Sequence, residues 1–312
     1  MKQFIKKTLL FLCIPIAIFI LGMLLPPTPR AKQSLLLVAP IKDSLLVHTQ
    51  EPRIIFLSGS SIGFGLVSQM VKDSIGRNPI NMGIHGGMGL YYLLDHTLPF
   101  VKKGDIVVLA PEYHQFYGNF CEGSEELVRV FFDNSNPMGY LNLRPVQLRK
   151  TYVFLPRYAL SKFTFSQYFN LKTHEFYSKR AFNQYGDVVQ HWGQTWPNPV
   201  VFQRIDGDYF NHDVMQAVVA FAGAVKAKGA TLYYTFPAYQ DVSFEAGQQQ
   251  IDQYWRELQK QPLEILGTPE RYRMTPDFIF DTPYHLNKAG MEKRTALLLE
   301  DLQAAMQKDG LK

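Results

Sequence analysis

Short apolar runs bounded by turn residues recur along most of this chain, and the stretches between them repeat apolar positions at helical spacing. Apolar runs of about 4–8 residues between Gly, Pro, Asn or Asp are typical of buried strands. Strands that alternate with helices form a parallel sheet that helices cover on both faces. The pattern therefore predicts an α/β fold with strands at 53–57, 79–82, 106–110, 231–235 and 263–266.

Helices are predicted between these strands and after the last one. They run to about residue 75, from about 88 to 101, from 213 to 228, from about 244 to 260, and from 287 to about 307. Residues 119–200 are rich in aromatics and prolines and have no clear period, so we interpret them as an insertion over the sheet edge or the site rim. Ligands of open sheets bind beyond the carboxyl ends of the strands, where we expect the functional residues.

The first residues follow a different pattern. Thr8–Leu25 is a run of eighteen residues without a charge, and as a helix it would nearly span a hydrocarbon layer of about 30 Å. A cleaved signal peptide is the alternative, but its apolar region is usually about 7–15 residues and ends at small residues rather than prolines. We therefore expect an uncleaved single-pass anchor within residues 1–30. The flanking charges and prolines are Lys2, Lys6, Lys7, Pro26, Pro27 and Pro29.

The basic flank predicts the orientation of this anchor, because Lys and Arg concentrate on the cytoplasmic side of a membrane. Arg30 and Lys32 on the other side partly offset this bias. We expect an anchor in the inner (cytoplasmic) membrane and a body that faces the periplasm or the cell exterior. Residues 31–52 are expected to be a tether, and residues 53–312 to be one domain.

Composition excludes several function classes. The net charge of +5 is spread along the chain without a dense basic block in the body, which disfavours nucleic acid as a partner. Cys13 lies in the apolar run and leaves Cys121 alone, so the body has neither an internal disulfide nor a cysteine zinc site. No His-Glu-x-x-His spacing occurs, and we expect no metal and no organic cofactor.

A serine cluster, Ser58-Gly59-Ser60-Ser61, follows the first predicted strand. A serine hydroxyl becomes a nucleophile when an adjacent base takes its proton, and a turn at a strand end exposes it for that reaction. An ordinary turn is the alternative interpretation. A phosphate loop is excluded, because the Walker pattern needs a lysine where Leu66 follows Gly65.

Asp281 and His285 lie directly before the last predicted helix. A carboxylate can orient a histidine through Nδ1 while Nε2 faces a serine. The alternative is that Asp281 is a turn residue and Asn287 caps the helix.

A third cluster, Asn81-Met-Gly83-Ile-His85-Gly86-Gly87, follows the second strand. Backbone N–H groups of such a turn can stabilise an oxyanion, with Asn81 and Gly83 as candidates, although a simple strand-to-helix turn has the same residues. Beside the pocket we expect His85 and the residues after the third strand, which are Glu112, Tyr113 and His114.

The order of these clusters resembles that of the SGNH hydrolase superfamily, the GDSL-like esterases and lipases. The resemblance covers about residues 53–120 and 205–305 and extends to a membrane-anchored subgroup of bacterial envelope proteins. It implies a flavodoxin-like, three-layer α/β/α fold and an ester hydrolase or O-acyltransferase that acts on acylated glycans. The segments that carry it are FLSGSSIGFGL, NMGIHGGMGLYYLLD, KKGDIVVLAPEYHQFYG and FDTPYHLNKAG.

The resemblance implies roles for four residues. Ser60 or Ser61 is the nucleophile, depending on the alignment of the glycine, and the alignment with Phe64-Gly65 favours Ser60. His285 is the base, Asp281 orients it, and backbone N–H groups hold the oxyanion.

This chain departs from the family pattern at the third strand, where Ala110-Pro111-Glu112-Tyr113 replaces the usual Gly-x-Asn-Asp. The Asp-x-x-His spacing is also longer by one residue. The competing hypothesis is therefore a catalytically silent, membrane-anchored scaffold that binds glycan or a multi-pass membrane acyltransferase.

Overall fold

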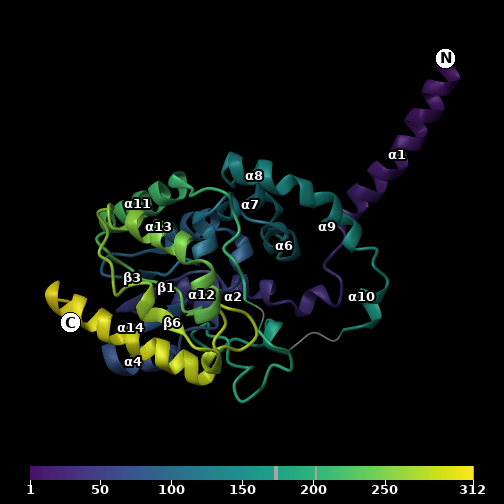
Figure 1. Ribbon diagram of the computed structural model, residues 1–312. Coiled ribbons are helices and arrows are strands. Elements are labelled where there is room, and N and C mark those ends of the chain that lie inside the picture. The colour runs from purple at the N-terminus through teal and green to yellow at the C-terminus, as the bar shows by residue number, and fades with distance from the viewer. Residues whose placement is uncertain (172–174, 201, 312) are drawn as a thin grey trace.

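The computed structural model describes residues 1–171, 175–200 and 202–311 (Figure 1). The first element is the 23-residue helix α1, Lys2–Leu24, which projects away from the rest of the molecule. It is long and apolar enough to cross a membrane, as its charge-free sequence predicts. All other described elements belong to one α/β body.

The body is built on a parallel sheet of four strands, as the apolar runs predict. The strands are β1 Arg53–Leu57, β2 Asn78–Asn81, β3 Ile106–Leu109 and β4 Thr231–Tyr234, in the order β2-β1-β3-β4. Ile55 is in register with Ile80 on one side and with Val107 on the other. Ile265 forms a parallel bridge to Tyr234 beyond β4, at the position of the fifth predicted strand. Strands of a parallel sheet are covered on both faces, which explains their continuous apolar runs.

Helices cover both sides of this sheet, as Figure 1 shows. On one side α4, Ser68–Ile75, packs against α14, Lys288–Lys308. On the other side α11, His212–Ala227, packs against α5, Leu90–Thr97, and against β4.

The remaining boundaries differ from the predicted ones where glycines interrupt the helices. The predicted helix after the first strand is divided into α3, Ser60–Gly63, and α4, and the one near 244–260 into α12, Asp241–Ala246, and α13, Gln248–Leu258. A second, two-stranded sheet of β5, Tyr239–Gln240, and β6, Arg273–Met274, has no counterpart in the prediction.

Short 3-10 helices also occur in the connections between these elements. They are η3 Gly86–Met88, η4 Leu98–Phe100, η5 Tyr113–Phe116, η6 Phe120–Glu122, η9 Glu270–Tyr272 and η10 Pro276–Phe278.

Residues 31–52 differ from the expected tether, because most of them are folded onto the body. They form η1, Ala31–Gln33, η2, Leu35–Val38, and α2, Ala39–His48. Leu46 is fully buried. Lys42 is also buried, and its Nζ donates to three carbonyl oxygens, those of Asn81 (2.8 Å), Gly83 (2.5 Å) and Gly186 (2.8 Å). An ammonium with three acceptors is satisfied inside the protein, so the segment is part of the domain.

The predicted insertion contains a group of short helices that lies near the end of α1 (Figure 1). Its aromatic residues are divided between the interior and the surface, which explains the lack of a clear period in the sequence. The elements are α6 Glu125–Asp133, α7 Pro137–Leu141, α8 Pro145–Thr151, η7 Tyr152–Phe154, α9 Leu155–Ser161, α10 Ser166–Phe169 and η8 Glu175–Tyr177.

Candidate active site

The turn after β1 brings Ser60 to the edge of a cavity of about 550 Å³. The strand ends at Leu57, Ser58 and Gly59 turn the chain, and α3 begins at Ser60. A Cβ at Gly59 would lie 2.7 Å from the Cα of Gly86, so glycine lets the turn after β1 approach the backbone at Gly86 closely, with Glu112 beside both. Oγ of Ser60 lies 3.5 Å from the same carboxylate oxygen.

Ser61 is directed into the protein instead. It is buried, and its Oγ lies 2.9 Å from Oγ of Ser58. The Ser58 hydroxyl donates its only proton to the carbonyl oxygen of Ala110 (2.6 Å), so Ser61 is the donor between the two serines. Of the two candidate serines, Ser60 is the one that lines the cavity.

His285 also lines this cavity, and three side chains hold its imidazole. Nδ1 of His285 donates to Oδ1 of Asp281 (2.9 Å), and the Tyr177 hydroxyl donates to the other carboxylate oxygen. The Phe64 ring stacks on the imidazole with centroids 4.0 Å and planes 10° apart. The contacts fix the plane of the ring and leave Nε2 for the cavity.

The Asp281 carboxyl is stabilised as an anion. Burial would raise its pKa, but the hydrogen bond and charge of His285, together with the Tyr177 hydroxyl, outweigh burial and lower the pKa below its usual value. An anionic partner on Nδ1 favours the imidazole tautomer in which Nε2 carries the free lone pair. This arrangement is that of a general base.

Backbone contacts connect the loop of His285 with the loop of Ser60. The N–H of Leu286 donates to the carbonyl oxygen of Phe64 (3.1 Å). Asn287 caps α14 by accepting from the N–H of Gly290 (3.0 Å), as one interpretation of the sequence predicted. Within the described residues no hydrogen bond joins Ser60 to His285, because the Ser60 hydroxyl contacts Glu112 instead.

Asn81 and Gly83 do not lie where an oxyanion would need them. The amide of Asn81 donates to the carbonyl oxygen of Ile62 (2.9 Å) and to Asp187 (2.8 Å). Its Oδ1 accepts from the N–H of Gly83 (2.9 Å), which is therefore already used. Both residues support the turn from behind the cavity wall rather than forming that wall.

Gly86, and not the predicted Gly83, borders the cavity together with Ser60. A Cβ on Gly86 would lie 2.1 Å from Oε2 of Glu112. Glu112 thus packs between Gly59 and Gly86, is 5% exposed, and accepts from the N–H of Ser61 (2.9 Å). Glu112 therefore adds a hydrogen-bond acceptor, and not a donor, to this part of the cavity wall.

The other three pocket candidates have different surroundings. Tyr113 is fully buried against Tyr239 and Tyr254 and does not reach the cavity. His114 lines the cavity, with its Nδ1 2.9 Å from the Tyr284 hydroxyl, and burial lowers its pKa. His85 lines it as well, and its Nδ1 accepts from the N–H of Gly87 (3.0 Å).

Three residues of the site received no role of their own in the sequence-based prediction: Phe64, Gly86 and Tyr177. Phe64 and Gly86 lie inside the segments that carry the family resemblance, so a signal existed for them. Tyr177 comes from the insertion, 108 residues from His285, and has no local signal.

Nothing in the part of the chain that the structure describes forms a group of three or more His, Cys, Asp or Glu side chains able to hold a metal ion. Comparisons with protein-family models, with curated proteins and with solved structures found no match to this chain.

Proposed function

We propose that this chain is a serine-dependent ester hydrolase or O-acyltransferase of the SGNH type. One observation carries the proposal: Ser60 and His285 line the same cavity, and His285 is oriented by Asp281. Serine, histidine and aspartate in these roles activate a hydroxyl for attack on an acyl carbonyl.

In the proposed mechanism, Oγ of Ser60 bonds to the acyl carbon while its proton passes to Nε2 of His285. Collapse of the tetrahedral intermediate breaks the bond to the leaving oxygen, which takes that proton. Water or an acceptor hydroxyl then attacks the acyl carbon and gives its proton to His285. The bond between the acyl carbon and Oγ of Ser60 breaks, Oγ takes the proton back from His285, and the acid or the new ester leaves. The Ser60 side chain must first rotate from Glu112 toward His285.

Ser60 is preferred to Ser61 as the nucleophile. The hydroxyl of Ser61 is buried and donates to Ser58, and Ser58 is in turn bonded to the carbonyl oxygen of Ala110. Attack by Ser61 would require its buried hydroxyl to leave Ser58 and reach the cavity, whereas Ser60 already borders the cavity.

The strand order supports the flavodoxin-like, three-layer form of the fold. With Ile265 beyond β4, the order β2-β1-β3-β4 followed by the bridge corresponds to the 2-1-3-4-5 order of that fold. Ser60, Gly86 and Glu112 all follow the carboxyl ends of its strands, where such folds bind their ligands.

The proposed setting is the cell envelope. Helix α1 would be a single-pass anchor in the inner (cytoplasmic) membrane, with the body on the periplasmic or outer side, as the basic N-terminal flank favours. The proposed substrate is an acylated envelope or exported polysaccharide, and a multi-pass acyltransferase in the same membrane is the proposed partner.

Glu112 favours a second function, that of a catalytically silent scaffold which binds glycan or the acyltransferase. The carboxylate accepts from the N–H of Ser61 and packs against Gly86, where an active site of this type needs hydrogen-bond donors.

Fluorophosphonate labelling of the full chain in detergent tests the two functions. We expect the wild type and Ser61→Ala to be labelled, and Ser60→Ala and His285→Ala to lose the label. Equal labelling of all four proteins, or of none, would contradict the hydrolase and favour the scaffold.

A further inference from the structure

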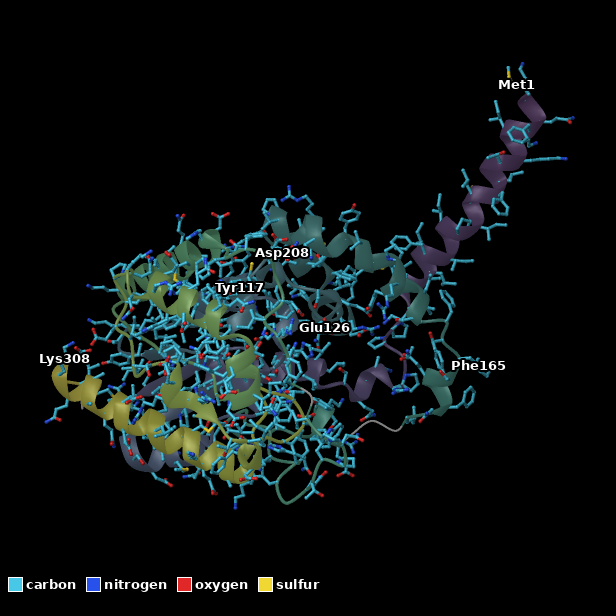
Figure 2. All side chains as sticks on the ribbon, in the orientation of Figure 1. Met1, Tyr117, Glu126, Phe165, Asp208 and Lys308 are labelled. Carbon is cyan, nitrogen blue, oxygen red and sulfur yellow. The ribbon has the colours of Figure 1, made fainter. Side chains whose placement is uncertain are left out.

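Large apolar side chains are exposed on the helices next to α1. Phe165 is 76% and Phe169 73% exposed, and Figure 2 places Phe165 at the outer edge of the body, on the side from which α1 projects. We call residues 152–171, which comprise η7, α9 and α10, the α9–α10 shoulder. Its other exposed apolar residues are Tyr152, Val153, Leu160, Phe163, Tyr168 and Leu171.

Helix α9 packs directly against the apolar run of α1. A Cβ at Gly22 would lie 2.4 Å from the carbonyl oxygen of Ala159, so glycine allows the two backbones to meet. Gly22 lies inside the charge-free run Thr8–Leu25 that is long enough to cross a membrane. If α1 spans a bilayer, α9 lies at the level of the last turn of the span.

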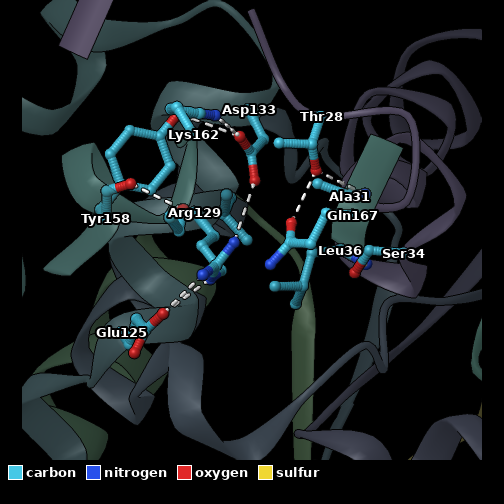
Figure 3. A network of polar contacts seen from close by, with 12 residues as sticks. Thr28, Ala31, Ser34, Leu36, Glu125, Arg129, Asp133, Tyr158, Lys162 and Gln167 are labelled. Atoms are coloured by element: carbon cyan, nitrogen blue, oxygen red, sulfur yellow. Dashed lines mark hydrogen bonds and ion pairs between the residues drawn. The ribbon is translucent and has the colours of Figure 1, made fainter. Parts of the chain in front are cut away.

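Polar contacts hold α10 to the residues that follow α1 (Figure 3). The Thr28 hydroxyl donates to Oε1 of Gln167 (2.7 Å), and the N–H of Arg30 donates to the carbonyl oxygen of Gln167 (3.1 Å). Three residues of extended chain cover at most about 10 Å, so Thr28 stays within that distance of Leu25. The shoulder is therefore close to the end of the apolar run.

A buried carboxylate connects the shoulder to the body. Asp133 at the end of α6 accepts from the Tyr158 hydroxyl (2.9 Å) and from Nζ of Lys162 (2.7 Å), as Figure 3 shows. Both partners come from the shoulder. The exposed apolar side chains are thus held in place by interior contacts.

The charges around the shoulder suit a lipid headgroup layer. Residues 135–171 hold five basic residues and no acidic one. Asp95, Glu125 and Asp133 form ion pairs with three of them. Within the described ranges Arg149 and Lys150 on α8 form no ion pair, although their charges act on nearby Glu122 and oppose the rise in its pKa that burial causes. Aromatic residues beside basic ones are typical of the membrane–water interface. The basic residues are Arg144, Arg149, Lys150, Arg157 and Lys162.

We propose that the α9–α10 shoulder is a second membrane contact, which inserts its apolar side chains into the headgroup region of the bilayer that α1 spans. Phe154 of the shoulder, and Lys150 just before it in sequence, also line the cavity of Ser60. The cavity then borders the lipid surface. On the proposed hydrolase function, which this step assumes, its substrate is an acyl ester carried at the membrane surface.

Tryptophan quenching by brominated lipid tests this contact. The full chain is reconstituted in phosphatidylcholine–phosphatidylglycerol vesicles as Phe165→Trp or Phe169→Trp, both at exposed sites where the larger ring fits. Val242→Trp on α12, also exposed, is the matched control, and Phe11→Trp in α1 is the reference for a membrane-embedded residue. The emission of the three native tryptophans is measured in the wild type and subtracted.

We expect brominated lipid to reduce the emission of Trp at 165 and 169, as at position 11, and to leave position 242 unchanged. If brominated lipid quenches Trp at 165 and 169 no more than Trp at 242, the proposal is overturned. The surface then faces water or a protein partner. Absence of quenching at position 11 would overturn the proposal as well. Fluorophosphonate labelling of the same samples separates the two proposals. Labelling without quenching contradicts the membrane contact alone. Quenching without labelling contradicts the ester chemistry alone.

Discussion

Replacing Glu112 by glutamine tests whether the carboxylate beside Ser60 limits the rate of acyl transfer. Oε1 of Glu112 lies 3.5 Å from Oγ of Ser60 and accepts from the N–H of Ser61. When Ser60 attacks an acyl carbonyl, negative charge develops on the neighbouring oxygen. That oxygen then lies beside a carboxylate, and the nearby Ser61 N–H is already used.

The size of the effect follows from two separate arguments. Two negative charges about 4 Å apart repel by about 4 kcal/mol at an effective dielectric constant of about 20. Loss of one oxyanion donor costs about 10²–10³ in rate. Glutamine keeps the shape of the side chain, removes the charge and adds an N–H donor. We therefore expect kcat/KM of Glu112→Gln to exceed that of the wild type by about 10²-fold.

The assay is hydrolysis of p-nitrophenyl acetate by the full chain in detergent near neutral pH. Glu126→Gln is the control, because Glu126 is a half-buried carboxylate near the same cavity that accepts from Ser124 and does not contact Ser60. Its kcat/KM should remain close to the wild-type value. The double variant Glu112→Gln/Ser60→Ala should lose the gained activity.

A decrease in kcat/KM of Glu112→Gln to the level of Ser60→Ala would refute this reasoning. Glu112 would then assist the reaction, and the carboxylate would be part of the chemistry. Lack of activity in every variant would instead refute the ester chemistry itself.

Three further changes have defined outcomes. Tyr177→Phe removes one of the two side-chain partners of Asp281, and we expect kcat to fall about tenfold with KM unchanged, the equivalent of about 1.4 kcal/mol in steady-state kinetics. Burial lowers the pKa of His191 to about 4 in the folded chain. Between pH 6.5 and 4, the histidine is therefore protonated in the unfolded chain but neutral in the folded one. The unfolding free energy of the wild type should therefore decrease by about 2–3 kcal/mol more than that of His191→Gln when the pH falls from 7 to 4.5. Equal decreases for the two proteins in denaturant titrations would contradict this assignment. Lys42→Met leaves three carbonyl oxygens unsatisfied and should lower the unfolding free energy by about 3 kcal/mol or more, whereas a change under about 1 kcal/mol would show that water replaces the ammonium.

The sheet could be predicted from the sequence because its central strands are buried on both faces. RIIFL and IVVL contain no polar alternation between Ile54 and Leu57 or between Ile106 and Leu109, and each is followed by turn residues. The position of Ser60 directly after such a strand, and of His285 directly before the last helix, could also be predicted. The parallel arrangement of the strands places Ser60 at the sheet's carboxyl edge.

Other features depend on contacts between distant residues and could not be predicted. Lys42 in a proline-containing segment has no sequence signal for burial, since its acceptors belong to residues 39 to 144 positions away. Gly83 and Gly86 lie in the same turn, and only the path of the backbone decides which of them borders Glu112. Tyr177 reaches Asp281 from an insertion whose course the pattern of apolar positions does not define.

The connection between α1 and the body is short and hydrogen-bonded, and it limits how far the candidate site can move relative to α1. Only nine residues separate Leu25 from Leu35, which is buried in the core, and Thr28 and Arg30 among them are already bonded to α10. A long flexible linker in its place would let the body take many orientations and many distances relative to α1. If α1 spans a membrane as proposed, these contacts hold the body close to the membrane surface. Substrates of the proposed enzyme would then have to reach it at that surface, by lateral diffusion or by delivery from a neighbouring protein.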